Sequence, residues 1–126
     1  MSAAVGFLIV LTTVGNEEQA NLLADELVVR RHAACVNVIK IQRTVYRWQG
    51  RVVDDNEYLL VSKTTDEEYP AVEKTIKELS TYELPEVLGF EVGRGEAGFL
   101  DWIAGNLGKD ADVSDETEVA KEPDQE

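Results

Sequence analysis

Apolar residues recur along the first third of this chain with two different periods, and the change of period predicts a strand followed by a helix. Residues 5–13 form an apolar run rich in β-branched side chains, which predicts a buried strand. After Asn16 the apolar residues recur every three or four positions, which predicts an amphipathic helix. Asn16 is the expected N-cap, and Gln19 is placed to complete a capping box. The buried stripe of this helix is expected to hold Ala20, Leu23, Ala24 and Leu27.

The middle of the chain favours extended structure. Residues 33–41 alternate as a second strand, which leads into a hairpin over residues 44–65 with its break at Gln49-Gly50. The returning strand is expected over residues 57–64, and the triplet Asp54-Asp55-Asn56 is expected to be a turn, a bulge or a solvated bend. The returning strand has apolar residues on both faces, which indicates burial on both sides: Tyr58, Leu60, Leu59 and Val61.

The last third of the folded part predicts a helix, a strand and a further helix. Thr65 or Asp66 is expected to cap a helix that ends near Ser80 and buries Tyr69, Val72, Ile76 and Leu79. Residues 87–92 are expected to form the last core strand. A third helix is expected over residues 97–107, with Gly108 as its C-cap and with inward-facing Leu100, Ile103, Ala104 and Leu107. This order predicts an α+β, ferredoxin-like βαββαβ fold with an added C-terminal helix.

The charge of the chain narrows its possible partners. Its 126 residues suit one domain, and 25 acidic against 12 basic residues give a net charge of −13. This charge argues against nucleic acid and against an anionic membrane surface as partners. No apolar run approaches the length of a membrane span, and the apolar N-terminus lacks the positive charge of a signal peptide. A single cysteine fits a reducing compartment, so a cytoplasmic location is expected.

Residues 109–126 differ in composition from the rest of the chain. They hold eight acidic residues and two lysines without apolar periodicity. Such a composition buries too little apolar surface to order itself. We therefore expect a folded domain over residues 1–108 and an acidic disordered tail over residues 109–126.

Aromatic and charged residues gather in the hairpin and in the loop after the second helix: Tyr46, Trp48, Glu57, Lys63, Tyr82 and Glu86. Such a set suits a subunit interface, a small-ligand pocket, or a pocket formed at an interface. Cys35 is interpreted as a structural thiol, and His32 as a solvated or capping residue, because neither has a partner at ligand or catalytic spacing. Trp102 is expected to pack the third helix. The sequence contains no P-loop, nucleophile elbow, zinc-protease or dinucleotide motif, so no enzyme activity, cofactor or metal site is predicted.

Five short motifs in a fixed order resemble the CutA-type divalent-cation tolerance family. They are Ala34-Cys35-Val36-Asn37, Tyr46-x-Trp48-x-Gly50, Glu57, Lys63-Thr64 and Tyr82-x-x-Pro85-Glu86. The resemblance extends over about residues 5–108 and depends on the ordered set rather than on any one motif.

The resemblance implies a compact, PII-like homotrimer with a regulatory or binding role in the response to divalent metal ions such as copper. The implied partners are further copies of the chain and a small molecule at the subunit interface. The implied ligand-binding or interface residues are Tyr46, Trp48, Glu57, Lys63, Tyr82, Pro85 and Glu86. Two alternatives remain open, namely an assembly or scaffold module and a small enzyme that uses interface carboxylates and Lys63.

The chain departs from the family at two positions that bear on copper. Members proposed to bind copper have a cysteine late in the first strand and a histidine before the later loop. This sequence has Thr12 and Ser80 there. Hydroxyl groups are poor substitutes for thiolate and imidazole as copper ligands. We therefore expect no tight, specific copper site.

Overall fold

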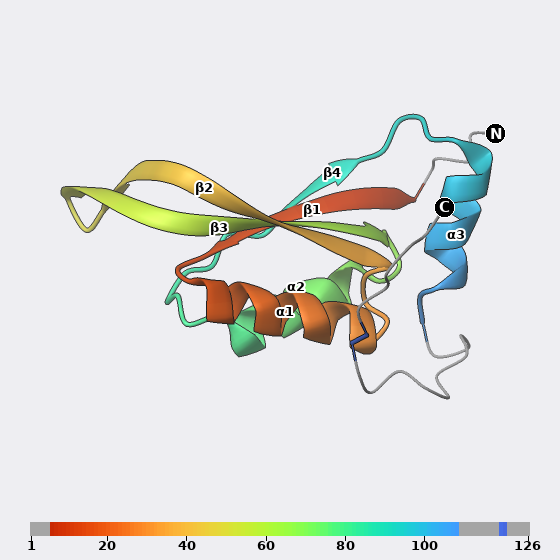
Figure 1. Ribbon diagram of the computed structural model, residues 1–126. Coiled ribbons are helices and arrows are strands. Elements are labelled where there is room, and N and C mark those ends of the chain that lie inside the picture. The colour runs from red at the N-terminus through yellow and green to blue at the C-terminus, as the bar shows by residue number, and fades with distance from the viewer. Residues whose placement is uncertain (1–5, 109–118, 121–126) are drawn as a thin grey trace.

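The computed structural model describes residues 6–108 and 119–120. The element order confirms the predicted α+β fold, βαββαβ followed by a helix. The sheet is antiparallel with strand order β2-β3-β1-β4, and α1 and α2 lie against one of its faces (Figure 1). The elements are β1 (Phe7–Val14), α1 (Glu17–Val29), β2 (Cys35–Trp48), β3 (Arg51–Thr65), α2 (Tyr69–Leu79), β4 (Leu88–Glu91) and α3 (Ala97–Gly105).

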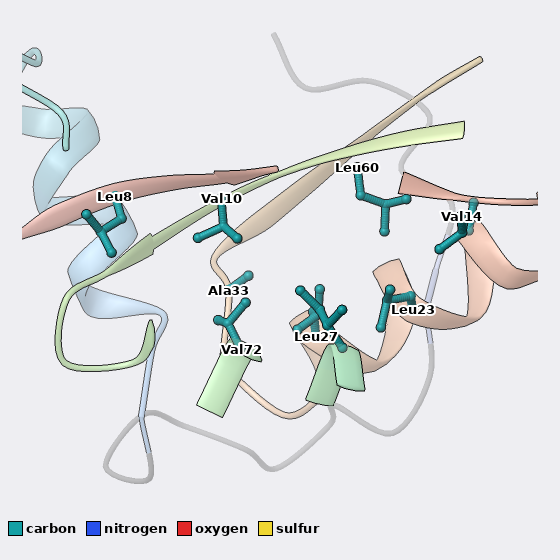
Figure 2. Close-up of a cluster of buried hydrophobic side chains, with 10 residues drawn as sticks. Leu8, Val10, Val14, Leu23, Leu27, Ala33, Leu60 and Val72 are labelled. Carbon is teal, nitrogen blue, oxygen red and sulfur yellow. The ribbon is translucent and has the colours of Figure 1, made fainter. Parts of the chain in front are cut away.

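The core lies between the sheet and the two helices α1 and α2. Alternate residues of β1 are buried, as expected for a strand with one face on a core. Val10 and Leu60 extend from the sheet toward Leu27 and Val72 of the helices (Figure 2). Burying one such side chain contributes about 1.5–3 kcal/mol relative to leaving it in water. The predicted stripe of α1 is confirmed, because Ala20, Leu23 and Leu27 are buried and Ala24 packs against the same cluster.

The start of α1 is capped as predicted, but the capping box is only half formed. Asn16 Oδ1 accepts a hydrogen bond of 2.8 Å from Gln19 N. The Gln19 side chain does not reach back to Asn16; its Oε1 accepts a bond of 3.3 Å from Thr81 N. Gln19 therefore joins the start of α1 to the segment that follows α2.

The second helix begins later than predicted. Thr65 Oγ1 accepts a bond of 3.3 Å from Glu68 N, but this bond closes a turn before the helix. The N-cap of α2 is Glu68, and its side chain makes no capping bond. Pro70 is the second helical residue, where its missing N–H leaves no helical bond unmade. Val72 and Ile76 are buried, while Tyr69 and Leu79 pack partly buried beside them.

The long hairpin of β2 and β3 extends beyond α1 and α2 (Figure 1). Its loop is confirmed at Gln49 and Gly50, whose positive φ values of 51° and 79° suit a two-residue hairpin turn. The prediction that Asp54–Asn56 interrupts the returning strand is wrong, because β3 continues through these residues. Acidic side chains are tolerated there because this part of the hairpin is solvated, and Asp54 Oδ2 lies 3.2 Å from Arg43 Nε.

The last strand and the last helix also differ from expectation. Strand β4 lies at the edge of the sheet and all four of its residues are exposed, so it is not a core strand in the single chain. Helix α3 ends at Gly105 with Asn106 as its C-cap, and Ala104 is exposed rather than inward. Leu100 and Ile103 are buried as predicted. Trp102 stacks on Phe99 with ring centroids 5.6 Å apart, and both rings remain well exposed.

The predicted acidic tail lies outside the described residues, except for residues 119 and 120. Among the described helices, none is long and apolar enough to cross a membrane.

Candidate functional site

The sheet face opposite α1 and α2, called the open face below, carries the candidate site. Ile9 and Leu59 belong to this face, because side chains alternate along strands whose other residues are buried under the helices. Helix α3 covers one end of it by packing on Phe7. Most of the remainder is half-exposed or exposed; Phe90 of β4, for example, is 52% exposed. The expected burial of β3 on both faces is therefore incomplete in one chain.

A β-bulge in β2 decides which side chains reach the other end of the open face. Ile41 pairs with Glu57 and Thr44 pairs with Asp55, so two residues of β2 oppose one residue of β3. Ahead of the bulge, odd-numbered residues of β2 share the face of Glu57; beyond it, even-numbered residues do. The bulge therefore places Tyr46 and Trp48 on the same face as Glu57.

The segment between α2 and β4 closes this end of the sheet. The Tyr82 hydroxyl donates a hydrogen bond of 2.6 Å to Glu57 Oε2. Tyr82 N donates to Ser80 Oγ at 3.1 Å, and Thr81 is held by Gln19 as described above. Gly15 leaves room for the ring, since a Cβ there would lie 3.2 Å from the Tyr82 hydroxyl oxygen. The segment is thus anchored to β3 and α1, and it packs against the turn between β1 and α1 at Gly15.

These elements enclose a cavity of about 430 Å³. This volume lies in the range of small-ligand sites. Its walls combine carboxylates, aromatic rings, hydroxyl groups and one leucine, contributed by Thr13, Thr44, Tyr46, Trp48, Glu57, Thr81, Tyr82, Glu83, Leu84 and Glu86. We call it the acidic–aromatic cavity.

The cavity carries negative charge without a lysine, arginine or histidine among the described residues that line it. Glu57 is only 5% exposed. Burial and the neighbouring Glu57 carboxylate raise the pKa of Glu86 above its ordinary value. Burial, followed by the hydrogen bond to Glu57, raises the pKa of Tyr82 strongly. Both pKa values rise, as expected where the surroundings destabilise an additional negative charge.

A second tyrosine hydroxyl, on the hairpin, is also hydrogen-bonded to a carboxylate. The Tyr46 hydroxyl donates to Asp55 Oδ2 at 3.2 Å. Burial and this hydrogen bond raise the pKa of Tyr46. Lys40 lines a separate cavity of about 500 Å³, which Glu57 also borders, and does not line the acidic–aromatic cavity.

Five of the seven residues predicted for the site line the cavity: Tyr46, Trp48, Glu57, Tyr82 and Glu86. The other two, Lys63 and Pro85, do not line it. Lys63 lies six residues along β3 from Glu57, about 20 Å away, and its Nζ donates to Asn37 Oδ1. Within one chain, Lys63 therefore does not join the carboxylates of the cavity.

Sequence reasoning missed half of the lining. Glu83 and Leu84 occupy the unspecified positions of the Tyr82-x-x-Pro85-Glu86 motif, and Thr81 directly precedes it, so the motif itself could have suggested them. Thr44 could not have been found without the bulge, because it reaches the cavity only through the change of face at that point.

The two residues at the copper-related positions do not meet in a metal site. Thr12 is buried on the helix-facing side of β1, and Ser80 is the C-cap of α2. In the part of the chain that the structure describes, no three His, Cys, Asp or Glu side chains are grouped so that they could hold a metal ion. Within the described residues, Thr12 and Ser80 therefore do not belong to a cluster of metal ligands.

The two isolated candidates have local structural partners. Cys35 is half-buried in β2 and pairs in register with Lys63. His32 Nδ1 lies 3.0 Å from Thr75 Oγ1, and burial lowers the pKa of its imidazole. His32 is therefore part-buried and hydrogen-bonded rather than solvated.

The fold and the sequence together place the chain among small PII-like α+β proteins. The model of the CutA1 divalent ion tolerance protein family matches residues 8–106. The chain belongs to this family. It is 42% identical over 100 residues to a divalent-cation tolerance protein CutA from Thermus thermophilus, covering 79% of this chain and 97% of that protein.

Solved structures agree with this assignment. The Cut A1 protein of Thermus thermophilus matches with a TM-score of 0.79 at 41% identity, covering 81% of this chain and 99% of that one. The CutA1 of Oryza sativa matches with a TM-score of 0.80 at 31% identity, covering 86% and 99%.

Members of the family differ in chain length and in cellular compartment. The human protein CutA is 34% identical over 91 residues, which cover 72% of this chain but only 51% of the human protein. A rice relative is named chloroplastic, and an Archaeoglobus fulgidus structure is described as periplasmic. A cytoplasmic location for this chain therefore stays a prediction.

Proposed function

We propose that this protein is a homotrimeric, PII-like regulatory or binding protein that contributes to divalent-cation tolerance by binding a small ligand, and that it is not an enzyme. The observation that carries this proposal is the acidic–aromatic cavity. Tyr46, Trp48 and Glu57 of the hairpin meet Tyr82 and Glu86 there, although two separate parts of the sequence supply them. A concave site with aromatic walls and a few polar groups is the usual form of a small-molecule site.

The open face supports self-association. Ile39, Leu88 and Phe90 lie on it and are all about half exposed. Strands β2 and β4 are both edges of the sheet, and an uncovered edge offers unpaired backbone groups to another chain. Large apolar patches on a small domain mark interaction surfaces. A trimer that covers this face would bury them and enclose the acidic–aromatic cavity further.

The lack of a metal cluster among the described residues supports a ligand other than tightly bound copper. We expect Cu(II) to bind weakly at acidic surface groups. Calorimetry on a protein that ends at Gly108 tests this expectation without the acidic residues that follow. One submicromolar Cu(II) site per subunit that survives Cys35→Ser would contradict it.

The two alternative functions make different predictions. An enzyme that uses Lys63 would lose turnover in Lys63→Ala while keeping its oligomeric state, yet Lys63 lies far from the cavity in one chain. A scaffold module would bind a stable protein partner and no small ligand.

A thermal-shift screen over nucleotides, metal ions, small acids and small amines tests the proposed function. We expect at least one compound to raise the melting temperature of the natural protein and to lose this effect in Trp48→Ala. Trp102→Ala is the matched control, because Trp102 is similarly exposed but lies on α3, outside the cavity. The proposal fails if no compound acts, or if every effective compound acts equally on both variants.

A further inference from the structure

Resting on the proposed function of the cavity as a ligand site, we propose that the acidic–aromatic cavity binds a small organic cation, a primary ammonium ion that carries a short apolar group. The ammonium would lie between the carboxylates of Glu57 and Glu86, and the apolar group against Tyr46, Trp48 and Leu84.

The charge of the lining selects for a cation. Glu57, Glu83 and Glu86 line the cavity, and no basic residue accompanies them among the described lining residues. Glu57 is nearly buried, so a charge placed beside it is weakly screened by solvent. A monovalent cation there gains attraction from several carboxylates, whereas a phosphate or carboxylate ligand would be repelled by them.

The hydroxyl groups point to the same choice. The Tyr82 hydroxyl already donates to Glu57, and the Tyr46 hydroxyl donates to Asp55. These phenol hydrogens are therefore not offered to an incoming anion. The threonine hydroxyls of the lining can accept a hydrogen bond from an N–H donor as readily as they can donate one.

The aromatic walls favour an organic cation over a hydrated metal ion. An ammonium group over the face of a tryptophan or tyrosine gains about 0.5–2 kcal/mol from the ring, depending on how far it is desolvated. Trp48 and Leu84 also offer apolar surface that a hydrated inorganic ion cannot use. Among the described residues no group of three or more His, Cys, Asp or Glu side chains could hold a metal ion, which favours an organic cation over a metal ion at this position.

The two tryptophans allow a direct test on the full chain. Their indole N–H signals are followed by NMR during titration with 2-phenylethylammonium, the neutral 2-phenylethanol and the anionic 3-phenylpropionate. We expect the ammonium ion to shift the Trp48 signal saturably and to leave the Trp102 signal unchanged. Binding of the alcohol should be at least about tenfold weaker, which corresponds to about 1.4 kcal/mol. The anion should not bind.

Two variants distinguish recognition of the ligand's charge from nonspecific binding. Glu86→Gln should weaken ammonium binding about fivefold or more, which is about 1 kcal/mol. Glu91→Gln, an exposed glutamate of β4 outside the cavity, should bind as the natural protein does. Binding should also weaken with added salt.

The inference is overturned if the ammonium ion leaves Trp48 unshifted, or if the alcohol or the anion binds as well as the ammonium ion. The proposed function survives that result if any other compound of the thermal-shift screen acts through Trp48. It falls only if no compound of the screen acts, or if every effective compound acts equally on Trp48→Ala and Trp102→Ala, so the two failures are distinguishable.

Discussion

The Tyr82 hydroxyl and Glu57 Oε2 lie 2.6 Å apart although the two residues are separated by 25 positions in the chain. This hydrogen bond joins the segment after α2 to the middle of β3. It closes one wall of the acidic–aromatic cavity and gives a nearly buried carboxylate a donor. The same contact therefore serves both the stability of the fold and the shape of the candidate site.

Removing that donor should destabilise the protein. Tyr82→Phe keeps the ring beside Gly15 but leaves the Glu57 carboxylate without the hydroxyl. A buried polar group that loses its partner typically costs about 1–3 kcal/mol in the free energy of unfolding. Chemical denaturation at neutral pH measures this change. Tyr46→Phe is the control and should have a smaller effect, because its bond to Asp55 lies at a more exposed position. Equal stability of Tyr82→Phe and the natural protein would show that the contact contributes nothing.

Glu86 should make stability depend on pH in the acidic range. Its pKa in the folded protein is raised above the ordinary value of 4.5 by burial and by Glu57. The folded state therefore holds this proton more tightly than the unfolded state does. As pH rises from about 4.5 through the raised pKa, ionisation of Glu86 progressively lowers the free energy of unfolding. Above the raised pKa this loss of stability stays constant.

Glu86→Gln removes this titration. We expect the variant to gain stability relative to the natural protein across that window and to keep the gain at neutral pH. The denaturation midpoints of the variant and of the natural protein should be compared from pH 4 to pH 8. This is about the range over which glutamates with raised pKa values titrate. Glu91→Gln on β4 is the control. A stability difference that stays constant over the whole range would contradict the account.

Trp48→Ala should weaken the protein in a way that depends on its concentration. Trp48 is 37% exposed in the single chain, so its burial within one subunit does not account for a large loss. At the centre of an interface, truncating a tryptophan typically costs about 2 kcal/mol or more. We therefore expect the melting temperature of Trp48→Ala to fall further at lower protein concentration.

Trp102→Ala provides the comparison for this experiment. Its side chain is 46% exposed and stacks on Phe99 of the same helix. We expect its effect on the melting temperature to be independent of protein concentration. Concentration-independent effects in both variants would place Trp48 outside any subunit contact.

Ending the chain at Gly108 should leave the domain intact. The backbone N–H of Gly108 donates to Arg31 O at 3.1 Å, which ties the end of the predicted domain to the residues after α1. The acidic composition of residues 109–126 predicts that they add little to the core. The melting temperature of the shortened protein should match that of the full chain, and a large fall would show that the removed residues pack on the domain.

The sequence predicted correctly those parts of the fold that depend on interactions between residues close together in the chain. The stripe of α1 and the Asn16 cap follow from helical spacing and from one side chain, and both are confirmed. The bulge in β2 left no such signal, yet it determines the face of Tyr46 and Trp48. A single extra residue changes that face, and only the pairing with β3 reveals it.

The remaining differences depend on surroundings that the sequence of one chain does not describe. Asp54 and Asp55 resemble a turn, but they continue a strand because that part of the hairpin extends into solvent. Leu88 and Phe90 resemble core residues, but they lie at an exposed edge. The spacing of Lys63 and Glu57 along one strand separates them, although both belong to the same ordered set of motifs.

If the open face is a subunit interface, the mass of the protein in solution is that of an oligomer. Light scattering coupled to size exclusion should be measured at micromolar concentration, on the natural protein and on Trp48→Ala. We expect a trimer of about 42 kDa, three times the chain mass of 14.0 kDa, and a partial shift to smaller species in the variant. A mass of 14.0 kDa for the natural protein would contradict it.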